Sequence, residues 1–361
     1  MSDAIEMTPP PPTGAPHAHA VLLRGPELLT LDVAVTRAGL VESTHRVHAA
    51  VVRPDGHLVA QARNPELHTW WRSCAKPFQL MPMLEDGTFD QLGWGDEELA
   101  LACASHGSEP EHVAVVERML ARSGLTEDAL ACGPHEPLTE RGARLLREAQ
   151  AQPTRIHSNC SGKHAAMLGR AVAHGWATDG YQRAEHPVQD AAWHAVASWA
   201  GIPTTDIPRG VDGCGVPVFA LSLHNMALAY ARLSLAAHEG QVVPARIVRA
   251  MTRHPHLVGG TDRFDTLLMQ AGAGRLIAKV GAEGVHSIGV IDQGIGIAIK
   301  VEDGAPRAQY PAVLACLQAI GALPARLPES LRSIAHHPIV NTRDDMVGAV
   351  FVPGHEVVEH G

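Results

Sequence analysis

The sequence predicts a mixed α/β fold of the α+β type, with a mainly antiparallel sheet built from both chain ends around an inserted helical region. Near the N-terminus, His48–Val52 and Leu58–Ala62 are apolar runs joined by Pro54-Asp55-Gly56, a pattern typical of a β-hairpin. In the C-terminal third, runs rich in Val and Ile alternate with Asp- and Gly-containing turns and predict a second group of strands: Val285–Ile291, Gly294–Val301 and Met346–Val352.

The middle of the chain is predicted to be helical because its apolar residues recur at spacings of three and four. The segments with this pattern are Glu97–Ala104, Glu111–Arg122, Lys163–His174, Val188–Ala200 and Val218–Leu233. Residues 1–18 are rich in Pro and small residues and are expected to be a disordered lead-in. The sequence shows no linker between independent folding units, so we expect residues 19–361 to form a single domain.

Composition narrows the class of protein. The chain has 361 residues, 45% of them hydrophobic, and a formal net charge of −9. It has no run of basic residues, which argues against nucleic acid or a membrane surface as a partner. Its apolar stretches are far shorter than the roughly 20 residues that span a membrane. Six irregularly spaced cysteines and no visible secretory signal favour free thiols in the cytoplasm.

Lysine is scarce in this sequence. Of 29 basic residues only four are lysines, namely Lys76, Lys163, Lys279 and Lys300, which leaves 25 arginines. Arginine can supply almost any solvated positive charge, but it cannot lose its proton near neutral pH. Each retained lysine is therefore a candidate for chemistry, with biased composition as the alternative explanation.

Ser73 and Lys76 form a Ser-x-x-Lys motif, which is common by chance and weak on its own. Ser105 follows in Ala104-Ser105-His106, and Lys279 begins a Lys-x-Gly motif. Active-site serine acyl-enzymes of the β-lactamase and penicillin-binding type use this order of motifs. The order indicates a serine nucleophile, a lysine base, a second hydroxyl that relays protons and a second cation.

A further group of residues suits either metal binding or burial. Cys160, Lys163 and His164 lie within one helical turn of each other, and Cys214 follows Asp212-Gly213. Thiol, imidazole and carboxylate groups are zinc ligands, whereas free cysteines are usually small buried residues. Both interpretations stay open on spacing alone. A loop role is favoured over metal binding for His254-Pro255-His256.

Several ordered motifs together resemble the Rhizobium-type asparaginase II family over roughly residues 20–355. The motifs are Val41-Glu42-Ser43-Thr44-His45-Arg46, Trp71-Arg72-Ser73-Cys74-Ala75-Lys76-Pro77, Ala104-Ser105-His106, His157-Ser158-Asn159-Cys160-Ser161-Gly162-Lys163-His164, Asp212-Gly213-Cys214-Gly215, and Val258-Gly259-Gly260 with Arg263-Phe264-Asp265. The resemblance implies a fold similar to serine β-lactamases and glutaminases, a homodimer, and hydrolysis of L-asparagine to L-aspartate and ammonia.

The resemblance also implies roles for individual residues. Two Ser–Lys tandems carry over to Ser73 with Lys76 and to Ser105 with Lys279. A zinc site of two cysteines and a lysine carries over to Cys160, Lys163 and Cys214. Asp212 matches the family's aspartate and is expected to grip the substrate α-ammonium group. The other residues expected to contact substrate are Arg72, His164 and Gly213.

These expectations combine into one hypothesis. Neutral Lys76 takes the proton of Ser73 as Ser73 attacks the side-chain amide, and Ser105, poised by Lys279, relays a proton to the leaving ammonia. Three alternatives stay open: a penicillin-recognising serine hydrolase, a zinc-dependent amidohydrolase using Cys160, His164 and Cys214, and a catalytically silent amino-acid-binding protein.

Overall fold

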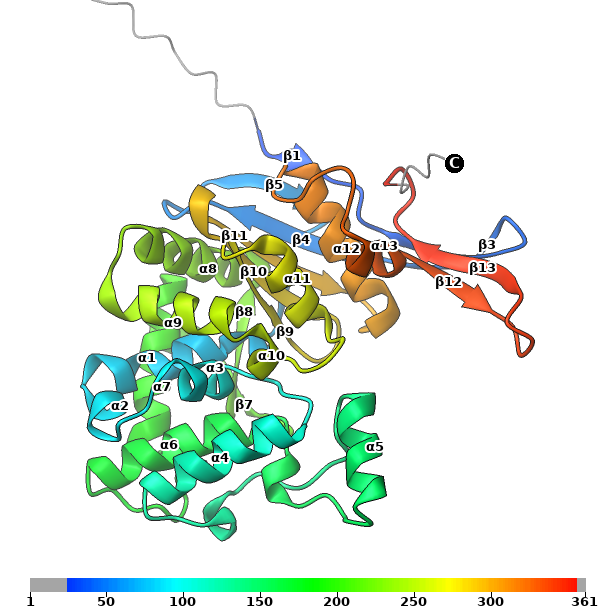
Figure 1. The fold of residues 1–361 in the computed structure, drawn as a ribbon. Coiled ribbons are helices and arrows are strands. Elements are labelled where there is room, and N and C mark those ends of the chain that lie inside the picture. The colour runs from blue at the N-terminus through cyan, green and yellow to red at the C-terminus, as the bar shows by residue number, and fades with distance from the viewer. Residues whose placement is uncertain (1–24, 356–361) are drawn as a thin grey trace, which may run out of the picture.

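The central layer of the molecule is a six-stranded sheet with the order β1-β5-β4-β11-β10-β9 (Figure 1). The computed structural model describes residues 25–355. The strands of this sheet are β1 (Glu27–Leu28), β5 (Leu58–Ala62), β4 (Val47–Val52), β11 (Ile295–Val301), β10 (Val285–Val290) and β9 (Leu276–Val280). All neighbours pair antiparallel except β1 with β5. The sheet therefore joins both ends of the chain, as predicted from the sequence.

The hairpin predicted near the N-terminus is present. β4 and β5 pair antiparallel, and Gly56 in the turn between them has a φ of 88°, which glycine adopts without steric cost. β4 is buried along nearly its whole length because β5 and β11 flank it and helices cover the sheet.

Two smaller sheets accompany the central one. The first has the order β12 (His336–Val340), β13 (Met346–Phe351), β2 (Val33–Arg37) and β3 (Leu40–His45), and it projects from the body in Figure 1. The second has the order β6 (His68–Trp70), β8 (Pro217–Ser222) and β7 (Arg209–Val211). The expectation of one sheet was therefore wrong for Met346–Val352, because β13 pairs with β12 and β2 rather than with β10 or β11.

Helices cover both faces of the central sheet and form the lower layer in Figure 1. They are α1 (Lys76–Glu85), α2 (Thr88–Gln91), α3 (Asp96–Ala102), α4 (Pro110–Arg122), α5 (Glu140–Glu148), α6 (Ser161–Ala173), α7 (Pro187–Ala200), α8 (Leu223–His238), α9 (Val242–Arg253), α10 (Pro255–Val258), α11 (Phe264–Gly272), α12 (Pro306–Ala319) and α13 (Glu329–Ala335). α8 lies along β4, β10 and β11, while α12 packs on β10 and β11 and α11 packs on β9. Within residues 25–355, every helix is too short or too polar to cross a lipid bilayer.

One predicted helix is divided into two elements. Val218–Leu233 was expected to be helical throughout, but its first residues form β8 and the helix α8 begins at Leu223. Ser222 marks the change because its side chain accepts a hydrogen bond from the backbone N–H of Asn225, which caps the helix. The apolar run is continuous across this boundary, so apolar spacing alone does not reveal it.

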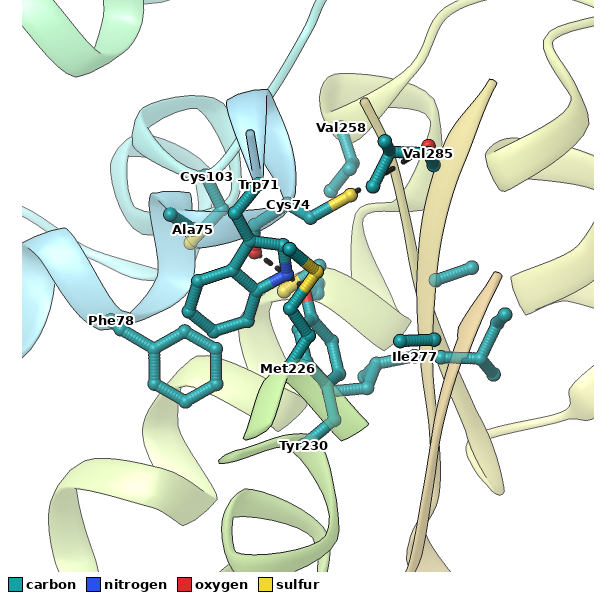
Figure 2. Packing of buried hydrophobic residues seen from close by; sticks show 14 of the residues in the cluster. Trp71, Cys74, Ala75, Phe78, Cys103, Met226, Tyr230, Val258, Ile277 and Val285 are labelled. Carbon is teal, nitrogen blue, oxygen red and sulfur yellow. Dashed lines mark hydrogen bonds between the residues drawn. The ribbon is translucent and has the colours of Figure 1, made fainter. Parts of the chain in front are cut away.

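An aromatic cluster holds the segment before α1 against the central sheet (Figure 2). The ring of Trp71 stacks on Phe78 at 5.0 Å, and its Nε1–H donates a hydrogen bond to Ser287 Oγ at 3.0 Å. Tyr230 from α8 donates to the carbonyl oxygen of Cys74 at 2.9 Å. These contacts fix the backbone on both sides of Ser73. The predicted disordered residues 1–18 lie outside the described part of the chain.

The close packing of α8 on β11 gives the first testable prediction. A Cβ added to Gly296 would lie 1.9 Å from the carbonyl oxygen of Ala227, so the helix must move away from the sheet. We expect Gly296→Ala to lower the free energy of unfolding by roughly 2–3 kcal/mol. Gly133→Ala is the matched control, because a Cβ there meets no atom within 4 Å. Urea denaturation of both variants tests this, and equal stabilities would contradict the packing described.

Candidate active site

A cavity of about 480 Å³ opens where the helical layer meets the end of β9. Its size suits a small molecule. Its polar and charged lining comes from six separate parts of the chain: Arg72 and Ser73, Ser105, His135, the segment Ser158–Cys160, the turn Asp212–Cys214, and Arg263. The fold thus brings most of the residues predicted from the sequence to one place.

Ser73 lies in a 3-10 turn, Arg72–Ala75, directly before α1. Side chains three residues apart lie above one another in a 3-10 turn, so Ser73 and Lys76 project to the same side. Arg72 has a φ of 52°, a left-handed conformation that is costly for a residue with a Cβ. Such strain is retained only where surrounding contacts enforce it, and it occurs often at functional sites.

Lys76 is the first residue of α1, and its side chain is completely buried. Its amine donates to Ser105 Oγ at 3.1 Å and to the carbonyl oxygen of Ala104. Both of these bonds go to the Ser105 loop rather than to Ser73. The structure therefore links Lys76 directly to the second serine of the predicted pair of tandems.

Ser105 lies just after α3, in a loop held by its own N–H donating to the carbonyl of Val258 at 3.1 Å. Lys279 reaches it from β9, with Nζ at 2.8 Å from Ser105 Oγ and 2.9 Å from the carbonyl oxygen of Val280. The hydroxyl of Ser105 therefore sits between two buried lysine amines. Burial, together with the positive charge of Lys76, lowers the pKa of Lys279 to about 8.

Asp212 and Arg72 form an ion pair in the wall of the cavity. Arg72 Nε donates to Asp212 Oδ1 at 2.8 Å, and the backbone N–H of Gly213 donates to the same oxygen at 2.8 Å. Burial acts to raise the pKa of Asp212, but the charges of Lys163 and Arg72 keep it below its ordinary value. Asp212, Gly213 and Cys214 lie together on the tight turn between β7 and β8.

Cys160, Lys163 and Cys214 also come together. Lys163 Nζ lies 3.3 Å from Cys214 Sγ, and Cys160 precedes α6, whose first turn contains Lys163. A hydrogen bond from the Cys160 thiol, opposed by burial and aided by Lys163, lowers the pKa of Cys214 to about 5. The same hydrogen bond and burial raise the pKa of Cys160 to about 12.

Two thiols and an amine are a donor set that suits zinc. Burial acts to lower the pKa of Lys163, but the negative charges of the Cys214 thiolate and of Asp212 raise it, so the amine holds its proton beside the thiolate. A metal ion at this place would have to displace that proton before nitrogen could coordinate.

His164 is placed differently from the expectation that it contacts substrate. Its ring is fully buried, and Nδ1 lies 2.6 Å from the hydroxyl of Tyr181. That hydroxyl already accepts from the N–H of Ala131, so it donates to Nδ1 and leaves the proton of His164 on Nε2. Nε2 has no hydrogen-bond partner among the described residues.

A second group of possible metal ligands consists of Glu109, His112 and His256, whose ligand atoms all lie within 4.8 Å of one another. In this group His112 Nδ1 accepts from the N–H of Glu109 at 3.1 Å, while Nε2 contacts the carbonyl oxygen of His256 at 2.9 Å. Arg141 contacts the carboxylate of Glu109. Both nitrogens of His112 are thus engaged and the negative charge is paired, which favours a structural polar cluster here.

Two residues that the sequence did not single out belong to the site. Arg263 lines the cavity and forms no ion pair with any residue between 25 and 355. Asp265 is buried behind β9 and accepts from the N–H of Val280 at 2.8 Å. Both lie in the motif Arg263-Phe264-Asp265, which carried the resemblance without any assigned role.

Comparison with protein families gives one match, to a model described as L-asparaginase II, over residues 33–352. The chain belongs to the L-asparaginase II family. Membership places it among the hydrolases that act on an amide, with a small molecule as substrate. A search of curated protein sequences gives no significant match.

Solved structures similar to this member of the L-asparaginase II family superpose loosely. A structure of Mglu has 14% identity and a TM-score of 0.43, with 77% of this chain and 67% of that chain covered. EstCE1, described as a hydrolase with promiscuous acyltransferase activity, has 12% identity and a TM-score of 0.38, with 75% and 92% covered. A probable glutaminase from Bacillus subtilis has 13% identity and a TM-score of 0.28, with 76% and 83% covered.

The two cysteines at the cavity give the second testable prediction. Because a hydrogen bond from Cys160 stabilises the Cys214 thiolate, the metal-free protein should retain one thiolate down to about pH 5. Cys160→Ala should move this titration to higher pH, since alanine removes the hydrogen-bond donor to the thiolate. Cys316→Ala, at a buried cysteine in α12, should leave it in place. Ultraviolet thiolate absorbance measures both; an unchanged midpoint in Cys160→Ala would contradict the assignment.

Proposed function

We propose that this protein hydrolyses L-asparagine to L-aspartate and ammonia through a covalent ester on Ser73. The observation that carries the proposal is the position of Ser105 Oγ between Lys279 Nζ at 2.8 Å and Lys76 Nζ at 3.1 Å, beside a cavity that Ser73 also lines. Three groups that exchange protons are thereby in direct hydrogen-bond contact, and a second serine lines the same cavity.

The surroundings of the two serines favour Ser73 as the nucleophile. Ser105 is 6% exposed, and its N–H donates to the carbonyl oxygen of Val258. Its hydroxyl contacts the amines of Lys76 and Lys279. Ser73 is half-buried and lies where a 3-10 turn leads into α1. Backbone N–H groups at such a start are oriented to stabilise an oxyanion, so that of Ser73 can serve this purpose.

The contacts support a proton relay that ends on Lys279. Lys76, as an ammonium ion, passes a proton to Ser105, and Ser105 passes its own proton to neutral Lys279. Lys76 then accepts the proton of Ser73 as Ser73 Oγ bonds to the amide carbon. This modifies the hypothesis that Lys76 is itself the neutral base, because Lys279 is the amine with a pKa lowered to about 8.

The remaining steps use the same path in reverse. The proton held by Lys279 returns through Ser105 and Lys76 to the leaving nitrogen, and ammonia departs as the C–N bond breaks. A water molecule then attacks the aspartyl ester while the relay accepts its proton. Cleavage of the ester returns a proton to Ser73 and releases aspartate, so that the free enzyme is restored.

The charges around the cavity suit the zwitterionic end of an amino acid. Asp212 is ionised and can bind an α-ammonium group, while Arg263 has no carboxylate partner among the described residues. Arg72 is already paired with the carboxylate of Asp212. We therefore assign Arg263, beside Arg72, as a second ligand for the α-carboxylate of the substrate. Gly213 contributes through its N–H, which orients Asp212.

Zinc fits the donor set of Cys160, Lys163 and Cys214, and these residues are the proposed ligands. When bound, zinc would supply a positive charge at the cavity wall that attracts substrate oxygen atoms. The residues themselves place a thiolate, an ammonium group and the carboxylate of Asp212 beside one another before any metal binds. His164 lies buried behind this group and supports it rather than contacting substrate.

The alternatives have separate tests. Turnover of a chromogenic cephalosporin would indicate a penicillin-recognising hydrolase, and complete loss of turnover on chelation would indicate a zinc-dependent amidohydrolase. Substrate binding without ammonia release would indicate a binding protein. A homodimer and a cytoplasmic location, both expected from the sequence, belong to the same proposal; light scattering measures the first and cell fractionation the second.

Ser73→Ala is the direct test of the nucleophile. Because the hydroxyl of Ser105 is held by two lysine amines and the ester is assigned to Ser73, we expect kcat for asparagine to fall by at least about 1,000-fold. Ammonia release is the measurement. Ser108→Ala is the matched control: its hydroxyl donates to the carbonyl of His157 outside the relay, so kcat should stay within a few-fold of the starting protein. Full activity in Ser73→Ala would end the proposal.

The zinc site has its own test. Cys214→Ser should abolish stoichiometric zinc binding, since it removes the thiolate ligand. His256→Ala, in the cluster with Glu109, should leave zinc content unchanged. Elemental analysis of the purified proteins measures both. Zinc retained in Cys214→Ser but lost from His256→Ala would place the metal at the other cluster.

A further inference from the structure

A buried carboxylate and imidazole lie behind the relay without touching the cavity. Asp265 is the second residue of α11 and is 2% exposed, and His286 on β10 is completely buried. Asp265 Oδ1 lies 3.0 Å from His286 Nε2, an ion-pair distance at which the angles do not meet those of a hydrogen bond. A buried charge is costly unless it is paired and hydrogen-bonded, so this pair needs an explanation that core packing does not supply.

The contacts around the pair hold both side chains in place. The amide nitrogen of Gln309 from α12 donates to the carbonyl oxygen of Val285 at 2.6 Å and lies 3.4 Å from His286 Nδ1, while His286 Nε2 faces Asp265. The other oxygen of Asp265 accepts from the N–H of Val280 at 2.8 Å. Burial acts to raise the pKa of Asp265, but His286 and these contacts lower it to about 2. Asp265 is thus ionised throughout the physiological range.

A short path joins this carboxylate to the relay. Asp265 fixes the backbone of Val280 through its N–H, and the carbonyl oxygen of the same residue contacts Lys279 Nζ at 2.9 Å. Lys279 Nζ in turn lies 2.8 Å from Ser105 Oγ. Asp265 can therefore affect the position of the Lys279 amine, through the Val280 backbone, and also its charge.

We propose that Asp265 is a positioning residue for the amide hydrolysis, which holds the Val280 backbone and faces Lys279 with a negative charge, and that His286 orients it. The expected effect of Asp265 on the reaction rate rests on the proposed function. Its expected effect on the pKa of Lys279 does not. Asp265 touches neither substrate nor the serines and acts entirely through Lys279.

The ionisable groups around Lys279 explain the direction of the effect. They are Lys76 on α1, Cys74 in the 3-10 turn, Cys103 after α3, Cys160 before α6 and Asp265 on α11. The three thiols are buried, and burial raises the pKa of Cys74 and of Cys103 to about 12, so they are neutral. Asp265 is the ionised carboxylate of this set and raises the pKa of Lys279 against burial and against Lys76. Removing its charge must lower that pKa further below about 8.

The scarcity of lysine makes a direct experiment possible. Protein labelled with carbon-13 at the lysine ε-carbon gives four signals, one for each lysine of the chain, and Lys279→Arg identifies the one of interest. In Asp265→Asn we expect the titration midpoint of Lys279 to fall by about one pH unit, the order of effect of a nearby opposite charge. Glu98→Gln removes another buried carboxylate, paired with Arg118, and should not move it.

Activity supplies the second readout. Lys279 must be neutral to accept the relayed proton, so kcat/KM should rise with pH around the Lys279 midpoint. In Asp265→Asn this rise should shift to lower pH by the same amount, and the plateau of kcat should fall several-fold because the amine is a weaker base. His286→Gln keeps the carboxylate charge, so its Lys279 midpoint should stay near that of the starting protein.

Each outcome decides the matter. An unchanged Lys279 midpoint in folded Asp265→Asn, or an equal fall in Glu98→Gln, would overturn the positioning role. If Asp265→Asn does not fold, Asp265→Ser carries the same expectation, because it removes the charge and keeps an acceptor for Val280. A shifted Lys279 signal in a protein without asparaginase activity would reject the proposed function and leave the role of Asp265 toward Lys279 intact.

Discussion

The meeting of two buried lysine amines at one serine hydroxyl is the constraint on which the rest of this structure depends. Two ammonium groups without solvent repel each other and lose their hydration, so the pair is stable only where carbonyl oxygens and a carboxylate compensate. Ala104, Val280 and Asp265 supply that compensation from three separate segments. The central sheet, which draws strands from both chain ends, is what brings Lys279 to a loop that follows α3.

The charged side chains of the site form two neighbouring groups with different proposed roles. In the relay, the lowered pKa of Lys279 leaves a neutral amine available close to physiological pH. At the cavity wall, the Cys214 thiolate and the carboxylate of Asp212 are balanced by Lys163 and Arg72. The first group can move protons, and the second can bind a metal ion and a zwitterion.

The sequence predicted the two ends of the central sheet and most of the helical middle, because the hairpin after Val47 and the periodic runs of α3, α4, α6 and α7 carry local signals. Motif order and the scarcity of lysine also pointed to the four residues proposed for the relay, and the family resemblance supplied the proposed cysteine–lysine group. The sequence could not show that Lys76 contacts Ser105, that Arg72 pairs with Asp212, or that Asp265 lies behind Lys279. Those contacts join residues 29 and 140 positions apart and, for Asp265 with the Val280 backbone, 15 positions apart across two different elements, and no local pattern encodes them.

The covalent intermediate is the central claim and can be observed directly. Protein mixed with asparagine and quenched in acid before turnover is complete can be digested and mapped by mass spectrometry. The account predicts an aspartyl ester on the peptide that contains Ser73, absent from a sample quenched without substrate. An ester found on Ser105 instead, or rapid ammonia release with no ester on either serine, would contradict it.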